Sequence, residues 1–353
     1  MLNVKKEGVI LEKTTLDFEN NGVLNPAAIR EGDFVHLFYR AVSEGNHSSI
    51  GYCKLNGPLQ VENRLDKPIL VPEFDYECQG IEDPRLVKIE DLYYLTYTAF
   101  DGINALGCLA TSTDLIHFEK RGILAPQFTH EEFLNLVKAN PLVDFKRYGY
   151  QLEEGVHRKD GVKMLVWDKN IIFFPRKIDG KFYFMHRIRG KVQFVATADP
   201  LHDLTPAFWQ NYFLHVHESL LFLPKYDHEI SYIGGGCPPI ETEFGWLLIY
   251  HGVKNSSKGN VYSACAALLD LENPQKEIAR LPYPLFEPEY QWELTGEVDN
   301  VCFPTGAVVF EDTLYIYYGA ADELIACASM SLSELTKELL RNKNEMGNKL
   351  MDS

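Results

Sequence analysis

Hydrophobic and polar positions follow one pattern that recurs five times along the chain. Each copy has a proline near its start, a short apolar segment, a tight polar turn and a segment rich in aromatic residues. Such β-branched and aromatic segments bounded by Gly, Asp and Pro are typical of β-hairpins. The copies cover residues 25–41, 83–99, 174–188, 238–253 and 303–320.

The distance from the turn to the end of the aromatic strand is the same in every copy. The pairs that stand seven residues apart are Asp33 and Arg40, Asp91 and Thr98, Gly180 and Arg187, Gly245 and Gly252, and Asp312 and Gly319. A third strand is predicted after each hairpin, at residues 50–55, 106–111, 192–197, 261–268 and 325–329.

The strand ends recur at intervals of 58 to 89 residues. Repeats of this size with three or four strands each are typical of propeller blades. The sequence therefore predicts an all-β fold, a five-bladed β-propeller that forms a single domain over residues 1–353. A β-sandwich with coincidental turn spacing is the alternative.

Two segments depart from the β pattern. The longest interval between copies contains an insertion at about residues 126–165, in which Thr129 and Glu132 form a capping-box sequence before an apolar run. We expect a short helix and an irregular loop on one face of the propeller there. A C-terminal helix is predicted at about residues 331–345.

The charge of the chain limits its partners. The formal net charge is −16, which argues against DNA, RNA or an anionic membrane surface as a partner. A local basic pocket for a small anion stays compatible with an acidic protein. The start of the chain lacks the apolar core of a signal peptide, and no apolar stretch is long enough to cross a bilayer, so we expect a cytoplasmic protein.

The cysteines point to packing and not to chemistry. Seven are spread singly, without a CxxC pair, mostly within apolar segments. We interpret them as small buried residues that form neither disulfides nor a metal site. No other metal-ligand spacing occurs, and no cofactor is predicted.

Asp83 is the first candidate for chemistry. It precedes Pro84 and Arg85 at the start of a predicted buried strand, and the innermost strands of a propeller converge on a central channel. A carboxylate in a concave, partly desolvated position tends to have a raised pKa and can act as a general acid. The alternative is a turn residue that pairs with Arg85 or caps local amides.

A second group of candidates is basic and polar. Lys169 and Asn170 lead into the third copy, and Arg187 and His251 lie at the ends of aromatic strands, with Tyr262 beyond. Cationic and hydrogen-bonding groups from neighbouring blades suggest an oxyanion pocket. Surface ion pairs and satisfied strand ends explain the same residues equally well.

The motifs taken together closely resemble glycoside hydrolase family 130, the β-mannoside phosphorylases and their hydrolytic relatives. The resemblance extends from about Asn25 to Leu335 and implies a five-bladed propeller. It is carried by segments 25–27, 39–41, 82–85, 97–101, 174–177, 233–240, 245–253, 303–307 and 318–322, which include Glu82-Asp83-Pro84-Arg85 and Gly234-Gly235-Gly236-Cys237-Pro238-Pro239.

The resemblance also implies roles for individual residues. Asp83 matches the catalytic acid of the family, whose proton is passed on through a sugar hydroxyl in the phosphorylases. The positions that bind the mannosyl unit correspond to Asn25, Arg40, Asp101 and Asp322. Those that hold phosphate correspond to Lys169, Asn170, Arg187, His251 and Tyr262.

These roles favour inverting phosphorolysis of a β-mannoside, either a mannooligosaccharide or mannosyl-glucose, to α-mannose 1-phosphate. Phosphate is already a nucleophile and needs only cations and amides to position it, whereas an inverting hydrolase needs a second carboxylate to activate water. Two departures favour the hydrolytic alternative, a β-1,2-mannosidase: Lys169 stands where arginine is frequent, and Tyr232 where lysine is expected. Glu218, Glu229 or Glu241 would then be the base.

Three further expectations follow from the resemblance. Neither reaction needs a cofactor, and phosphate serves as a co-substrate of the phosphorylase. The insertion at 126–165 is expected to shape the acceptor side of the site, and a homo-oligomer is reasonable. A sugar-binding propeller without activity is the third possibility, against which the retained Asp83 argues.

Overall fold

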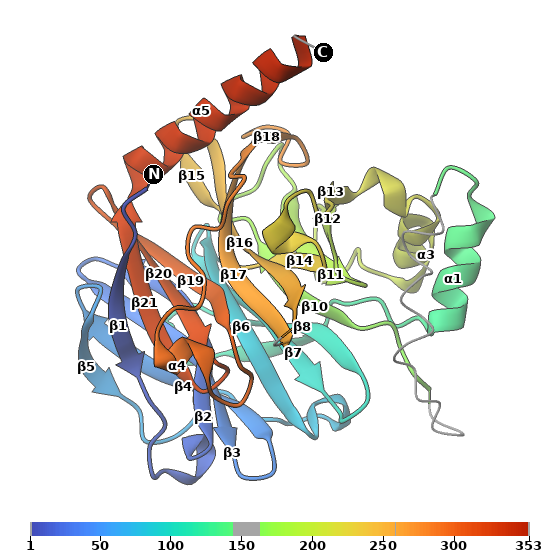
Figure 1. The fold of residues 1–353 in the computed structure, drawn as a ribbon. Helices are drawn as coiled ribbons and strands as arrows, with labels where there is room; N and C mark the ends of the chain where they lie inside the picture. Colours follow the sequence, from blue (N-terminus) through green and yellow to red (C-terminus); the bar gives the residue numbers. More distant parts are fainter. Residues whose placement is uncertain (1, 144–162, 258, 352–353) are drawn as a thin grey trace.

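The computed structural model describes residues 2–143, 163–257 and 259–351. The fold is mostly β, as predicted (Figure 1). The strands form five antiparallel units, numbered here in chain order. Unit one contains β2 (Gly22–Glu31), β3 (Phe34–Ser43), β4 (His47–Asn56) and β5 (Gln60–Arg64). Unit two contains β6 (Gly80–Ile89), β7 (Leu92–Phe100), β8 (Ala105–Ser112) and β9 (Glu119–Ile123). Unit three contains β10 (Asp168–Phe173), β11 (Phe182–Ile188), β12 (Lys191–Thr197) and β13 (Leu220–Phe222).

Units four and five complete the series. Unit four contains β14 (Tyr232–Gly235), β15 (Ile240–Thr242), β16 (Gly245–Ser256), β17 (Gly259–Leu269) and β18 (Glu277–Arg280). Unit five contains β19 (Cys302–Phe310), β20 (Thr313–Ala320), β21 (Leu324–Ser331) and, as its fourth strand, β1 (Lys5–Leu11) from the start of the chain. Four of the five predicted hairpins and all five predicted third strands are confirmed. In the third copy, predicted over 174–188, the first strand lies earlier, at Asp168–Phe173, and pairs with β11.

The units pack against one another in chain order, and the last returns to the first. The first strand of unit one, β2, contacts both β6 of unit two and β19 of unit five, while β6 contacts β10 and β10 contacts β14. Each of the five large hydrophobic clusters lies between two neighbouring units, including one between units five and one. Both faces of most sheets are therefore buried, which explains the nearly continuous apolar strands.

Unit four departs from the predicted repeat by one residue. Thr242 pairs with Gly245 around a two-residue turn, so Gly245 already belongs to the strand and is not the last turn residue. Tyr250 of unit four consequently corresponds to Tyr39 of unit one, and His251 corresponds to Arg40. On the next strand of each unit, Tyr39 pairs with Gly51 and Tyr250 pairs with Cys265. The predicted equivalence of Gly252 with Arg40 was wrong.

A buried glutamate recurs in four of the five units. Glu19, Glu77, Glu229 and Glu293 are fully buried, and each lies in a short helical turn before the first strand of its unit: Asp17–Glu19, Asp75–Glu77, Asp227–Glu229 and, in α4, Gln291–Leu294. Each accepts a hydrogen bond of 2.6–2.9 Å from a second-strand tyrosine, in order Tyr39, Tyr97, Tyr250 and Tyr318. Each also pairs with one cation, in order Arg64, Lys120, Arg280 and Lys6.

This glutamate–tyrosine–cation cluster fixes the loop that enters each of the four units. The carboxylate also accepts backbone N–H groups, as Glu77 does from Glu73 and Phe74. A buried charge is tolerated where an opposite charge and hydrogen bonds satisfy it. Sequence analysis did not predict the cluster.

The longer helices lie at the edges of the fold (Figure 1). Helix α1 (His130–Ala139) confirms the helix predicted in the insertion, and Thr129 and Glu132 form the predicted capping box. The loop predicted after it falls mainly on residues outside the described ranges. Helix α3 (Pro206–Leu214), which was not predicted, packs against α1. The C-terminal α5 (Leu332–Met351) begins one residue later and ends six residues later than predicted.

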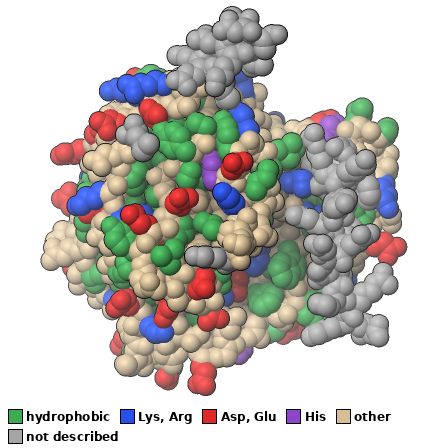
Figure 2. All heavy atoms as spheres, viewed as in Figure 1, with side chains coloured by type: hydrophobic (Ala, Val, Ile, Leu, Met, Phe, Trp, Pro, Cys, Tyr) green, Lys and Arg blue, Asp and Glu red, His purple; other side chains and the backbone are tan. Residues whose placement is uncertain are grey.

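The burial of the cysteines and the mixture of charges on the surface fit the composition of the chain. All seven cysteines are free, and six are buried as expected, whereas Cys78 is exposed. On the face drawn in Figure 2, acidic and basic side chains are interspersed among hydrophobic ones. Within the described ranges, no helix has the length and apolar character needed to cross a membrane.

Candidate active site

Three first strands carry the same local distortion. The pairing register shifts between Leu24 and Ala27 in β2, at the corresponding place in β6, and again in β10. At these bulges Asn25, Asp83 and Asn170 adopt left-handed backbone conformations, with φ of 49°, 50° and 60°. Asn and Asp tolerate this conformation better than other residues with a Cβ, and bulges redirect side chains. All three side chains consequently line one cavity.

The cavity has a volume of about 220 Å³ and lies where units one to five meet. It brings together eight of the ten residues predicted for the site: Asn25, Arg40, Asp83, Lys169, Asn170, Arg187, Tyr262 and Asp322. The other residues that line it are Glu82, Tyr232, Val298, Val301 and Phe303.

Asp83 lies among hydrogen-bond donors and cations. Its Oδ1 accepts a hydrogen bond of 2.8 Å from Asn25 Nδ2 and lies 4.0 Å from Arg40 Nη1. Burial acts to raise the pKa of Asp83, but the charges of Arg40, Lys169 and Arg85 and the hydrogen bond from Asn25 hold it below its usual value. The raised pKa expected from the sequence was therefore wrong for the ligand-free protein.

Arg85 supports the backbone of Asp83 and leaves its carboxylate free for other partners. The buried guanidinium donates through Nη1 to the carbonyl oxygens of Asp83 and Pro84, both at 3.0 Å, and through Nε to the Gly236 carbonyl. Burial lowers the pKa of Arg85 to about 10. The guanidinium thus ties the bulge of unit two to the glycine-rich segment of unit four.

Asp322 is the carboxyl group in the cavity whose pKa is raised. Burial and the charge of Asp83 raise the pKa of Asp322 to about 6, against an opposing effect of Arg40. Its backbone is also left-handed, with φ of 52°. At slightly acidic pH this side chain can donate a hydrogen bond to a ligand, which an ionised carboxylate cannot do.

Glu82 links the two sides of the cavity. One carboxylate oxygen lies 2.8 Å from Arg40 Nη2, and the other lies 3.6 Å from Lys169 Nζ. Arg40 also donates to Ser48 Oγ at 2.9 Å. Glu82 was part of the motif that identified Asp83, but sequence analysis gave it no role; its position directly before Asp83 was the available signal.

The predicted phosphate residues form a partly buried basic wall and are not surface ion pairs. Arg187 Nη1 lies 3.5 Å from Nε2 of His251, and its guanidinium lies over the ring of Tyr232. The hydroxyl groups of Tyr232 and Tyr262 are 2.5 Å apart. Burial, together with the charges of Arg187 and Arg85, lowers the pKa of His251 well below its usual value, so the imidazole is neutral at pH 7.

His251, which was predicted among the residues that hold phosphate, is not among the residues that line the cavity. It is fully buried behind Arg187, and its ring packs against Phe303 at a centroid distance of 4.4 Å. Gly234 makes room for it, because a Cβ there would overlap the imidazole. The glycine-rich segment therefore allows a close approach between the backbone of β14 and the imidazole.

Asp101, which was predicted to bind the mannosyl unit, is also not among the residues that line the cavity. Its Oδ1 accepts hydrogen bonds from the backbone N–H groups of Ile103 and Asn104 at 2.8 and 2.6 Å, and its Oδ2 accepts one from Asn104 Nδ2 at 3.0 Å. A local turn therefore occupies both carboxylate oxygens.

The three glutamates considered as a base for hydrolysis lie elsewhere. Glu229 belongs to the buried cluster of unit four, and Glu241 forms a bidentate pair with Arg176 on the surface. Glu218 is exposed and near His217. Other partners hold two of these glutamates, and none of the three lines the cavity.

A buried pair behind the basic wall was also missed. Asp168 and His186 are fully buried, and Asp168 Oδ2 lies 2.7 Å from His186 Nδ1. His186 Nε2 lies 2.8 Å from the hydroxyl of Tyr212 on α3. Each member of the pair directly precedes a cavity residue, Lys169 or Arg187. No group of His, Cys, Asp and Glu within the described ranges is arranged to hold a metal ion.

Comparison with known proteins defines the class. Residues 12–341 match the family model described as beta-1,4-mannooligosaccharide phosphorylase, glycoside hydrolase family 130. The chain belongs to this family, so it is an enzyme of a family that acts on β-mannosides.

Individual relatives are similar to this chain over most of its length. The chain is 34% identical over 339 residues to a 1,2-beta-oligomannan phosphorylase of Thermoanaerobacter sp. (strain X514), covering 93% of this chain and 96% of that protein. It is 35% identical over 326 residues to a beta-1,2-mannobiose phosphorylase of the same organism, covering 88% and 91%. The structure of the beta-1,2-mannobiose phosphorylase from Listeria innocua in complex with beta-1,2-mannobiose is similar in fold, with a TM-score of 0.71 at 22% identity, covering 96% and 99%.

Proposed function

We propose that the protein is an inverting phosphorylase of β-1,2-linked mannosides, which releases α-mannose 1-phosphate. The observation that carries the proposal is the composition of one cavity, where the carboxylates of Asp83 and Asp322 face a basic wall that contains Lys169 and Arg187. Carboxylates and amides suit a sugar, whereas the basic wall suits phosphate. The names of the two Thermoanaerobacter relatives support the β-1,2 linkage.

The reaction assigns a proton to Asp83 and the attack to phosphate. Phosphate oxygen bonds to the anomeric carbon from the face opposite the leaving group, while the bond from that carbon to the glycosidic oxygen breaks. The proton of Asp83, passed through a sugar hydroxyl, goes to the glycosidic oxygen. Inversion of the β-linkage then gives the α-phosphate.

Binding of phosphate prepares Asp83 for this role. In the ligand-free protein, Arg40, Lys169 and Arg85 favour the ionised form of Asp83. A phosphate dianion beside Lys169 and Arg187 offsets this positive charge, so the pKa of Asp83 rises when the substrates are bound. Proton transfer is thereby linked to occupancy of the phosphate site.

The remaining cavity residues have binding roles in this scheme. Asn25, Arg40 and Asp322 bind the mannosyl unit, while Lys169, Asn170, Arg187 and the Tyr232–Tyr262 pair contact phosphate. His251 acts through Arg187, against which it packs, and Asp101 holds the turn 101–104 in place. Glu82 fixes Arg40 and Lys169 relative to each other.

Hydrolysis finds less support in this cavity. An inverting hydrolase needs a carboxylate base that is free to activate water. The carboxylates that line the cavity besides Asp83 are Glu82, which is held by two cations, and Asp322, which binds the mannosyl unit in this scheme.

The fold proposed for this site is a five-bladed propeller in a single domain. Five antiparallel units, five hydrophobic clusters between them, and the return of β19 to β2 support a closed ring of blades. β1 would close the ring as the outer strand of the last blade. A homo-oligomer and a cytoplasmic location stay predictions.

A product assay tests the function directly. The protein is incubated with β-1,2-mannobiose and with β-1,4-mannobiose, each with and without inorganic phosphate. We expect phosphate-dependent formation of α-mannose 1-phosphate from the β-1,2 substrate. Release of free mannose at the same rate without phosphate would establish water as the nucleophile and overturn the proposal.

A further inference from the structure

The three bulges that line the candidate active site share a backbone feature. At each, two residues of the first strand lie opposite one residue of the second strand, and the second of the two is Pro26, Pro84 or Ile171. A buried carbonyl that leaves the strand ladder needs another hydrogen-bond donor. A side chain supplies that donor to each of these three residues.

The donor at the bulge of Asp83 differs from the other two. A threonine hydroxyl serves the bulges of units one and three, from Thr305 at 2.9 Å and from Thr96, respectively. Arg85 Nη1 instead donates to the carbonyls of both Asp83 and Pro84, each at 3.0 Å. A neutral hydroxyl is thus sufficient for a bulge of this kind, and the backbone alone does not require a guanidinium.

Stability does not explain the charge of Arg85 either. The side chain is 1% exposed, its hydrogen bonds go to backbone carbonyls, and no carboxylate of the described residues lies within ion-pair distance of it. Arg280, which is 3% exposed, is paired with Glu229 and Glu277. A charge that is buried without an opposite charge is costly, which points to a role of Arg85 in function.

Arg85 joins the acid of the cavity to its phosphate side. Its Nε donates to the carbonyl of Gly236, in the glycine-rich segment of unit four. That segment continues from β14, whose Tyr232 lines the cavity beneath the guanidinium of Arg187. One buried side chain therefore holds the bulge of unit two against the strand that contributes to the basic wall.

We propose that Arg85 is a positioning residue of the reaction, which holds Asp83 at a fixed distance from phosphate bound at the basic wall. The inference rests on the proposed phosphorolysis. Three carbonyls from two units fix this bulge, whereas one hydroxyl serves each bulge that carries a binding residue, Asn25 or Asn170. Tighter positioning suits the acid, because a displacement of about 1 Å in a reacting group can slow a reaction about 10²-fold.

A change of leaving group tests whether Arg85 acts through Asp83. Phosphorolysis is measured with β-1,2-mannobiose, whose leaving sugar needs a proton, and with 2,4-dinitrophenyl β-mannoside, whose leaving group departs without one. Arg85→Lys keeps the charge but replaces the planar fork with a single ammonium group. We expect kcat for the biose to fall about 10²-fold and kcat for the aryl mannoside to change less than about threefold. The ratio of the two rates does not depend on how much of the variant is folded.

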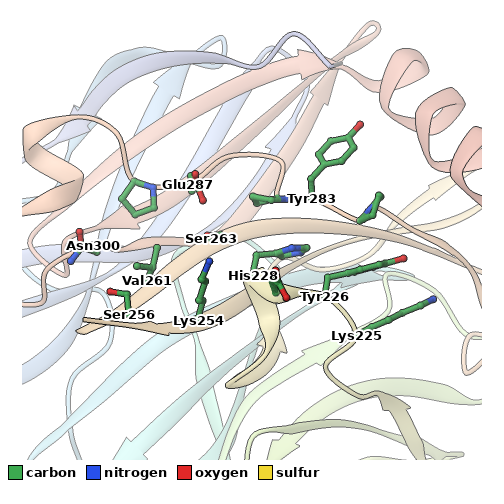
Figure 3. Close-up of a pocket in the computed structure, with 14 residues that line it drawn as sticks. Lys225, Tyr226, His228, Lys254, Ser256, Val261, Ser263, Tyr283, Glu287 and Asn300 are labelled. Carbon is green, nitrogen blue, oxygen red and sulfur yellow. The ribbon is translucent and has the colours of Figure 1, made fainter. Parts of the chain in front are cut away.

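Two controls separate positioning from stability. Arg280→Lys changes another buried arginine that donates to a backbone carbonyl, that of Leu223, and should leave the ratio of the two rates unchanged. Lys254→Ala removes a cation from a larger cavity of unit four, of about 730 Å³, between the loops that carry Tyr226 and Tyr283 (Figure 3). Among the described residues none lines both cavities, so neither rate should change.

The double variant Arg85→Lys/Asp83→Asn completes the test. If Arg85 acts through Asp83, the double variant is no slower with the biose than Asp83→Asn alone. Losses that multiply, an equal loss with both substrates, or no loss in Arg85→Lys would overturn the inference.

Failure of the proposed function gives a different result. If turnover of the biose by the natural protein needs no phosphate, phosphorolysis is excluded, and release of free mannose replaces α-mannose 1-phosphate as the readout. The same comparison of leaving groups then decides the role of Arg85, because an inverting hydrolase also needs a general acid.

Discussion

Units one, two, four and five bury the same glutamate–tyrosine–cation cluster, whereas unit three buries a different one. In unit three, His186 occupies the strand position of Tyr39, and it pairs with Asp168 and with Tyr212 of α3. The repeated cluster ties a loop to its sheet. The cluster of unit three instead lies directly behind Lys169 and Arg187, two residues of the catalytic cavity.

The difference separates two uses of buried polar groups. A cluster that occurs in four units is explained by what the units share, namely the entry of the chain into a sheet. A cluster that departs from the repeat is explained by what is particular to unit three, namely its contribution to the anion side of the cavity. We therefore expect changes in the first kind to alter stability, and changes in the second kind or in the cavity to alter activity.

The largest expected effect comes from the cavity itself. Asp83→Asn removes the proton donor but preserves the size and the hydrogen bond with Asn25. We expect kcat to fall about 10³- to 10⁴-fold, the upper range for loss of a general acid. The measurement is phosphate-dependent turnover, with thermal unfolding as a check that the fold is intact. Undiminished turnover would remove Asp83 from the catalytic role.

The second effect tests the repeated cluster. Glu77→Ala leaves the buried ammonium of Lys120 without its carboxylate, and we expect a loss of about 3–5 kcal/mol in the free energy of unfolding. Urea unfolding measures it. The matched control is Glu62→Ala, which breaks the partly exposed pair with Lys54 and should cost no more than about 1 kcal/mol. Equal losses in both variants would show that burial of the cluster contributes nothing.

The comparison of the units also shows which features can be predicted from the sequence. The hairpins were predictable because strand alternation, turn residues and spacing are local, and Asn25 and Asp83 were found because a proline follows each. The clusters were not predictable, since their partners are far apart in sequence, as Lys6 and Glu293 are. No local sequence pattern predicts such a pair.

The departures from what the sequence predicted have physical causes. Asp101 was placed in the site by resemblance, but nearby amides satisfy its carboxylate. The pKa of Asp83 was expected to rise through burial, but Arg40 and Lys169 from other strands, together with Arg85 from its own strand, reverse the effect. Helix α3 was missed because its aromatic residues resemble a strand, although Thr205 and Pro206 form a helix start. Of these, only the competing charges around Asp83 come in part from residues far apart in the sequence, whereas the amides beside Asp101 and the helix start at Thr205 are local.

The third effect concerns Asp322, a partly buried carboxyl group outside both kinds of cluster. Its pKa of about 6, against 3.8 ordinarily, means that the folded protein retains a proton that the unfolded chain releases. Stability is therefore lost as the pH rises from about 3.8 to about 6, and the loss reaches roughly 3 kcal/mol above that window. Asp322→Asn should remove this loss.

Urea unfolding at two pH values measures the change. We expect the stability advantage of Asp322→Asn to grow from roughly 1.5 kcal/mol at pH 5 to roughly 3 kcal/mol at pH 8. An advantage that is independent of pH would show that the carboxyl group titrates normally. Binding of mannoside should weaken in the same variant, which distinguishes Asp322 from a residue with only a structural role.

The smallest effect tests the comparison most directly, because it asks whether the cluster of unit three positions the anion side. Asp168→Asn keeps the size of the side chain but removes the charge that holds His186. We expect KM for phosphate to rise about tenfold, or 1.4 kcal/mol, while kcat and KM for the mannoside change less than about twofold. Tyr212→Phe, which removes only a hydroxyl on the far side of His186, is the control and should change KM for phosphate less. A loss of stability with unchanged KM for phosphate would make the cluster of unit three equivalent to the other four, and the departure from the repeat would then have no functional meaning.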